Sequence, residues 1–259
     1  MAQRLGFFRL PPETENAQKI GWLDVAGAFA LYFLVGQLLL LHLFRSAFSE
    51  KETEGWPILW SALLSALALA LYNLCCTPAV RAQVWREGAL LETFSQKANS
   101  FVRGAAAWLL AFPWVFFNMQ LANIVNQVWH FGPPEEQVAV KLLKQSSEEP
   151  LLLLPMLFSV IFIAPWMEEL LFRGFLQSWL KQSFGRFSAI LLSALLFALF
   201  HYAAEQRYEN APILSSMLIL GCFLGFLKEK ERSLWAPIGL HVTFNLIGSF
   251  FILMVEKNV

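Results

Sequence analysis

Apolar residues in this chain are concentrated in long blocks, and short polar segments separate these blocks. A helix needs about 20 mainly apolar residues to cross the hydrocarbon layer of a membrane. Blocks that approach or exceed this length lie at residues 25–44, 57–80, 104–128, 151–177, 188–204, 211–227 and 234–255. The pattern therefore predicts an all-α, polytopic transmembrane helical bundle of about seven to eight spans.

Two stretches between the blocks are less apolar but still have a helical pattern. Residues 81–103 are amphipathic, which is typical of a helix that lies in the membrane interface. Residues 135–147 follow a pair of prolines and are expected to form a short helix; insertion of either stretch would give the eighth span. We predict transmembrane and interfacial helices at 1–150 and a second part at 151–255.

Composition and charge agree with a membrane protein, since 57% of the residues are hydrophobic and only 15% are charged. The formal net charge is zero, so nothing favours nucleic acid as a partner. Of the 19 Lys and Arg residues, thirteen fall on the side of the predicted bundle that holds the N-terminus. Because cytoplasmic segments carry the excess of Lys and Arg, we predict that the N-terminus is cytoplasmic.

The fourth block contains two adjacent carboxylates, Glu168 and Glu169, with apolar sequence on both sides. A charged side chain in lipid is costly unless it is paired or faces a cavity, so it indicates a functional site. Arg173 follows Glu169 by the four-residue spacing of an intrahelical ion pair. Neighbouring helical positions point about 100° apart. We therefore expect Glu169 to pair with Arg173 and Glu168 to face other groups.

Two histidines and an asparagine from other blocks are expected to reach the depth of Glu168. Glu168 and His201 lie nearly the same distance before and after Gly185, where we expect the turn of an antiparallel hairpin. His241 and Asn245 are four residues apart in the last block and share one helix face. The sequence thus predicts that these four polar side chains converge.

The four side chains together would suit the hydrolysis of an amide. Glu168 and His201 could activate water, while His241 and Asn245 could donate hydrogen bonds to the oxyanion of a tetrahedral intermediate. Two Glu and two His would also suit zinc in a metal-dependent protease, although the HExxH pattern is absent. A non-catalytic scaffold or transporter is a further alternative, because polar residues often serve only as contacts between membrane helices.

Three short patterns in the chain resemble those of the CPBP family of intramembrane glutamic proteases. The EExxxR pattern of the family is matched by residues 168–173, FxxxH by Phe197 to His201, and HxxxN/D by His241 to Asn245. They occur in order, each on a separate predicted span. The family includes type II CAAX prenyl endopeptidases and bacterial proteins of bacteriocin processing or immunity.

The resemblance implies a catalytic core at 151–255 that needs no metal or other cofactor. It implies that Glu168 is the general base and that His201 helps to activate water. It also implies an oxyanion hole formed by His241 and Asn245. Structural support would come from the remaining residues of these patterns, Glu169, Arg173 and Phe197.

The resemblance also implies a site that opens to the cytosol and to the bilayer. We accordingly expect an integral protein of a bacterial inner (plasma) membrane. Its partners would be the lipid bilayer and a membrane-associated peptide or protein substrate. Prenylated CAAX tails are one class of such substrates.

Overall fold

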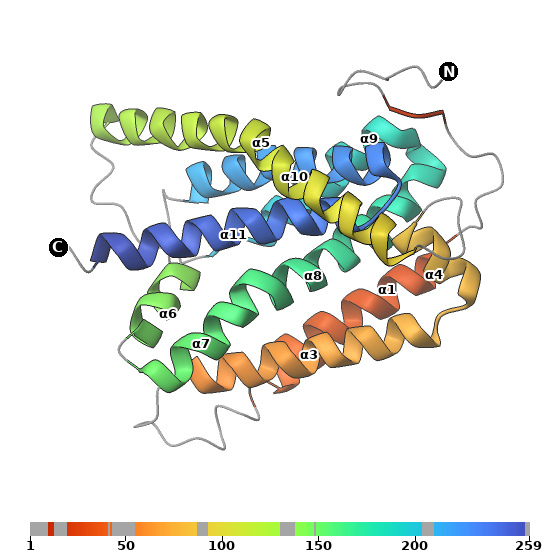
Figure 1. Cartoon of the computed structure of the whole chain (residues 1–259), viewed down its shortest axis with the longest axis horizontal. Coiled ribbons are helices and arrows are strands. Elements are labelled where there is room, and N and C mark those ends of the chain that lie inside the picture. Colours follow the sequence, from red (N-terminus) through yellow and green to blue (C-terminus); the bar gives the residue numbers. More distant parts are fainter. Residues whose placement is uncertain are drawn as a thin grey trace.

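The computed structural model describes residues 10–12, 20–40, 42, 55–86, 93–129, 138–147, 149–203 and 210–256. Nearly all of these residues are helical and none of them forms a β-strand, which confirms the all-α prediction for this part of the chain. Figure 1 shows the helices packed as one bundle. In chain order they are α1 (Trp22–Ala30), η1 (Leu31–Leu40), α3 (Gly55–Cys75), α4 (Pro78–Trp85), α5 (Phe94–Trp129), α6 (Val138–Ser147), α7 (Pro150–Phe158), η2 (Ser159–Ile163), α8 (Ala164–Glu169), η3 (Leu170–Gln177), α9 (Ser178–Leu199), α10 (Asn210–Glu231) and α11 (Trp235–Glu256).

The described helices include five that are long and apolar enough to cross a membrane, so the chain is an integral membrane protein. The predicted fourth span and most of the fifth fall within Leu151–Leu199, a helical run from α7 to α9 that is interrupted at Gly185. At the first predicted span, the apolar helix Trp22–Leu34 is shorter than the others. The number of seven to eight spans therefore stays a prediction.

The two less apolar stretches are helical wherever they are described. Most of α4 and the start of α5 occupy 81–103, while residues 87–92 lie outside the described residues. The short helix expected at 135–147 begins at Val138 as α6, and its first predicted residues lie outside the described part.

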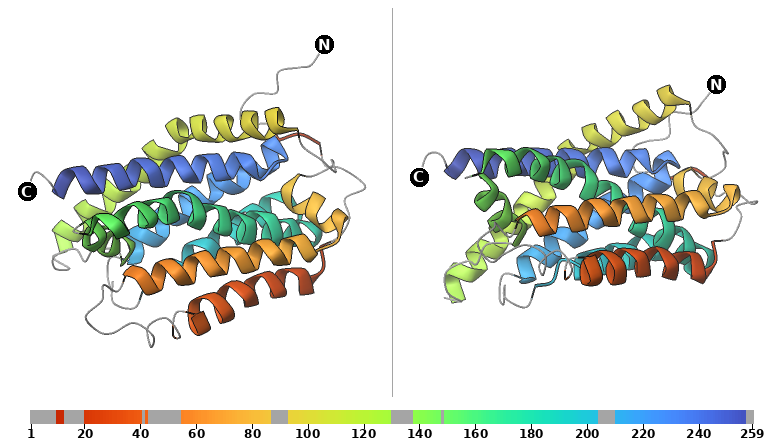
Figure 2. Two further views of the ribbon diagram at one scale, coloured as in Figure 1. Left: turned by 60° about the horizontal axis from the view of Figure 1, so that its bottom comes forward. Right: turned by 90° about the horizontal axis from the view of Figure 1, so that it is seen from below.

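The turn expected at Gly185 is present inside α9. Gly185 has a φ of 73° and a ψ of 173°, which interrupts the helix. Glycine adopts this positive φ readily because it has no Cβ. The turn lies at the same end of the bundle as α4, the end of α10 and the start of α11 (Figures 1 and 2). These Lys- and Arg-rich segments thus gather at one end, and its assignment to the cytoplasm stays a prediction.

Helix α5, from the N-terminal part of the chain, meets α11 at two glycines. A Cβ added at Gly104 would overlap the carbonyl oxygen of Ala236, and one at Gly239 would overlap that of Phe101. Small residues permit such close backbone contact between membrane helices. The predicted site residue His241 lies one half-turn beyond Gly239. The close contact with α5 therefore helps to hold the part of α11 that carries His241.

We expect Gly239→Ala to destabilise the protein by about 1–3 kcal/mol, because the added methyl group would force α5 and α11 apart. The measurement is the midpoint of unfolding in detergent, followed by tryptophan fluorescence. Gly248→Ala is the matched control on the same helix, since nothing lies within 4 Å of its added carbon. Equal midpoints for the two variants would contradict a tight crossing.

Candidate active site

The continuous segment of α8 and η3, which we call the central helix, carries two charged side chains that are completely buried, Glu169 and Arg173. Arg173 Nη1 lies 3.1 Å from Glu169 Oε1, and both side chains are 0% exposed. This is the ion pair that the four-residue spacing predicted. Every residue of η3, which follows Glu169, is buried as well. The pair is therefore enclosed by protein on all sides, where an unpaired charge would be strongly destabilising.

His241 of α11 lies between the two carboxylates. Its Nδ1 is 2.8 Å from Glu169 Oε1, whereas its Nε2 is 3.7 Å from Glu168 Oε2. The contact of His241 with Glu169, which is made in addition to the Glu169–Arg173 pair, was not expected from the sequence. It is possible because the two nitrogens of one imidazole point in different directions. A single ring can thus contact two carboxylates that diverge from neighbouring helical positions.

The two carboxylates differ in their access to solvent or lipid. The Glu168 side chain is 21% exposed, and the Glu169 side chain is 0% exposed. Glu169 has two bonded partners on its Oε1, whereas the contact of Glu168 with His241, at 3.7 Å, is longer than a hydrogen bond. Of the two, Glu168 is therefore the carboxylate that a small molecule can approach.

His201 reaches this region at the end of α9 through Phe197. The His201 Nδ1 lies 2.9 Å from the carbonyl oxygen of Phe197, and the two rings meet edge to face at 4.7 Å. Since a carbonyl can only accept, Nδ1 carries the proton and Nε2 has the free lone pair. The Phe197 ring also lies 5.8 Å from the His241 ring. Within the described residues, His201 makes no ion pair with Glu168, so the structure brings it near the site without direct contact.

Asn245 bonds to the backbone carbonyl of Val160, which lacks the backbone N–H donor that it would have in a regular helix. The N–H of Ala164 donates to Ser159 in the π-helical turn η2, and the next residue, Pro165, has no N–H for Val160. Asn245 Nδ2 fills this gap by donating to the Val160 carbonyl oxygen at 2.8 Å. The bond ties α11 to η2 and leaves one amide hydrogen of Asn245 for another acceptor.

The structure adds neighbours that the sequence patterns did not indicate. Tyr32 of η1 lies within electrostatic reach of the Glu168 carboxylate. The same helix packs Phe33 against Phe200, with ring centroids 4.5 Å apart, beside His201. An aromatic residue in a first apolar block looks like any lipid-facing side chain, so the sequence held no signal for this contact.

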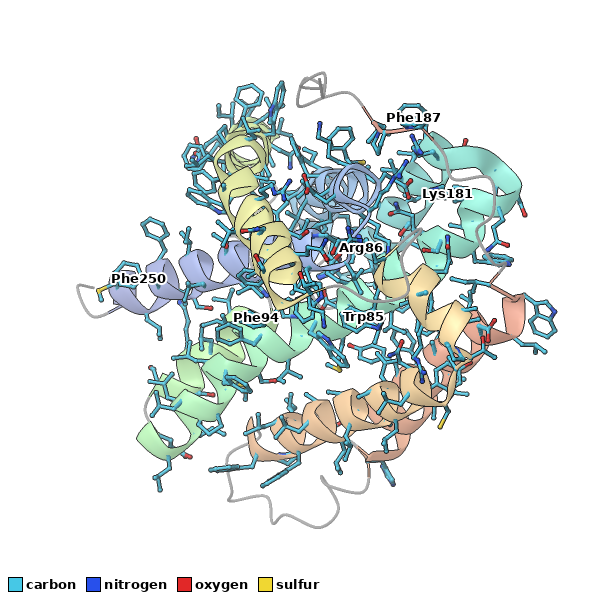
Figure 3. All side chains as sticks on the ribbon, turned by 45° about the vertical axis from the view of Figure 1, so that its right-hand side comes forward. Trp85, Arg86, Phe94, Lys181, Phe187 and Phe250 are labelled. Atoms are coloured by element: carbon cyan, nitrogen blue, oxygen red, sulfur yellow. The ribbon has the colours of Figure 1, made fainter. Side chains whose placement is uncertain are left out.

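A second aromatic group joins α4, α8 and α11. The Trp85 ring lies 5.4 Å from that of Trp235 and 6.4 Å from that of Trp166, and the Trp85 carbonyl accepts from Leu234 N–H at 2.8 Å. Figure 3 shows Trp85 and Arg86 where these helices meet. The predicted interfacial stretch therefore braces the helix that begins just before Glu168.

Comparisons with known proteins agree with the motif analysis. Residues 150–247 match a family model described as type II CAAX prenyl endopeptidase Rce1-like. An "Uncharacterized 24.3 kDa protein" of Escherichia coli is 26% identical over 118 residues, which make up 46% of this chain and 52% of that protein. The match thus spans about half the length of that relative. No solved structure matches the chain. The family match contains every predicted site residue.

We expect Asn245→Asp to be less stable at high pH than at low pH. A protonated carboxyl can still donate to the Val160 carbonyl, whereas an ionised one places negative charge against it. Loss of a buried hydrogen-bond donor costs about 1–3 kcal/mol. The measurement compares the unfolding midpoints of the variant and of wild type from about pH 5 to about pH 8, where most proteins are stable. A gap between them that does not widen as the pH rises would contradict the assigned bond.

Proposed function

This chain belongs to the CPBP family, and from that premise we propose that it is a metal-independent intramembrane glutamic endopeptidase. The observation that carries the proposal is the unequal pair of carboxylates around His241. Glu169 is buried and bonded, while Glu168 is partly exposed and lies 3.7 Å from His241 Nε2. Glu168 is therefore suited to the general base, which must reach water and the substrate.

In the proposed reaction, Glu168 takes a proton from a water molecule whose oxygen attacks the peptide carbonyl carbon. His201 assists through its Nε2, because its Nδ1–H is already bonded to Phe197. When the C–N bond breaks, Glu168 returns the proton to the leaving amine. Atoms and charges balance without any further reactant.

The oxyanion of the tetrahedral intermediate would be stabilised by Asn245 and His241. Asn245 has one amide hydrogen that its bond to Val160 does not use. His241 can donate from Nε2 when that nitrogen also carries a proton, because Nδ1–H is bonded to Glu169. Fixed donors of this kind stabilise charge that develops in the transition state.

The substrate would be a peptide or protein held at the membrane, and a prenylated CAAX tail is the class that the family description names. We place the protein in a bacterial inner membrane, with the N-terminus cytoplasmic and the site open to the cytoplasmic side. The charge distribution of the sequence supports this orientation.

Glu168→Gln should lower turnover by roughly 10²- to 10⁴-fold, because the amide cannot accept the proton of the attacking water. The measurement is comparative proteomics of membranes that contain wild type or the variant, since C-termini found only with wild type identify substrates. Prenylated tails among them would assign the CAAX class. His42→Gln is a control for expression, because His42 is exposed. Full turnover by Glu168→Gln would overturn the proposal.

Cleavage of an identified substrate should persist in the presence of a zinc chelator. The two carboxylates contact different nitrogens of one imidazole, and no group of His, Cys, Asp or Glu suited to a metal occurs in the described residues. The measurement is turnover of purified protein in lipid vesicles with and without the chelator, together with metal analysis. Activity lost to the chelator and restored by zinc would favour the zinc-dependent alternative.

A further inference from the structure

We infer that Glu169 is the positioning residue of His241: its carboxylate holds the Nδ1–H of the imidazole and thereby turns Nε2 toward Glu168. The role of this orientation in turnover rests on the proposed function. The contact itself does not, and it assigns Glu169 more than the neutralisation of Arg173.

The orientation of the His241 ring follows from the two unequal contacts. The bond from Nδ1 to Glu169 Oε1 is 2.8 Å long, and the contact of Nε2 with Glu168 Oε2 is 3.7 Å, beyond hydrogen-bond range. A carboxylate that is bonded to Arg173 acts as an acceptor, so the proton lies on Nδ1. The bond made by one ring nitrogen determines which nitrogen of a histidine remains available. Glu169 therefore decides what His241 presents to Glu168.

Glu169 can hold the ring because it is itself fixed from a third helix. Its Oε1 also accepts from Arg173, whose Nη2 donates to the Gly221 carbonyl of α10 at 3.3 Å. A Cβ at Gly221 would stand 3.0 Å from Ala194 and 3.3 Å from the guanidinium, which is tighter than an ordinary contact, so glycine at this position favours the close approach of α10. The chain of contacts thus runs from α10 through the central helix to α11.

Phe197 limits the movement of the same groups from a fourth side. The guanidinium carbon of Arg173 lies 4.2 Å from the centre of the Phe197 ring, which also meets the His241 ring edge to face. An arginine over an aromatic face is attracted by the ring electrons. The FxxxH motif residue therefore supports both ends of the Glu169 bridge.

Two double variants separate positioning from charge neutralisation. Glu169→Leu with Arg173→Met removes the ion pair together with the acceptor for His241 Nδ1–H. Glu169→Gln with Arg173→Met removes the same charges but keeps an amide oxygen as acceptor. Replacement of a buried pair by apolar residues is often neutral for stability, so both are expected to fold, and their unfolding midpoints are measured first.

The first measurement is the protonation of the His241 ring by NMR of ¹⁵N-histidine-labelled protein, assigned by loss of the signal in His241→Gln. Wild type and the Gln/Met variant should carry the proton on Nδ1. The Leu/Met variant should lose this preference, while the signals of His42 stay unchanged in all proteins. A wild-type ring without a proton on Nδ1, or two double variants with the same ring state, would overturn the inference.

The second measurement is steady-state turnover of a substrate found with wild type. The Leu/Met variant should have a kcat at least about tenfold below that of the Gln/Met variant, with KM within about twofold, because a misoriented group affects the reacting geometry rather than binding. Equal kcat values would refute a positioning role in the reaction. If the rings behave as expected but wild type cleaves no substrate, the proposed function fails and the positioning of His241 stands.

Discussion

The burial of charge in a membrane protein is the constraint on which this structure depends. Glu169 and Arg173 lie in a stretch that is closed to solvent, where either charge alone would be unstable. Each also bonds to a group on another helix: His241 on α11 for the carboxylate, and the Gly221 carbonyl on α10 for the guanidinium. The demand for partners therefore determines which helices surround the central one. Glu168, the neighbouring residue, is then the carboxylate of the two that stays partly exposed.

Helices outside the family match contribute to the same arrangement. α5 contacts α11 through Gly104 and Gly239, and its Asn118 donates to the Ser216 hydroxyl of α10 at 2.8 Å. α4 reaches α8 and α11 through Trp85. The N-terminal part thus acts as a brace for the helices that carry the predicted site, rather than as a separate unit beside them.

Local spacing in the sequence was sufficient for features that depend on one helix or one turn. The Glu169–Arg173 pair follows from a four-residue interval, and the turn at Gly185 follows from a glycine between two apolar blocks. Local spacing could not predict the contacts between helices. The bond from His241 to Glu169 depends on the rotation of α11, and the bond from Asn245 to Val160 depends on the carbonyl left free before Pro165. Tyr32 lies near Glu168 only through packing of η1, for which the apolar pattern gives no register.

The complete burial of Leu170–Gln177 has a consequence for how the protein is made. Each charged residue at the centre of a helix costs roughly 2.5–3.5 kcal/mol on insertion into a membrane, and this segment carries Arg173 just after two glutamates. Without the helices that pack around it, the segment is therefore expected to insert less favourably into the bilayer. The later helices α10 and α11 supply the carbonyl and the imidazole that compensate these charges. We therefore expect stable membrane integration of the middle of the chain to be completed only after its last helices have been synthesised.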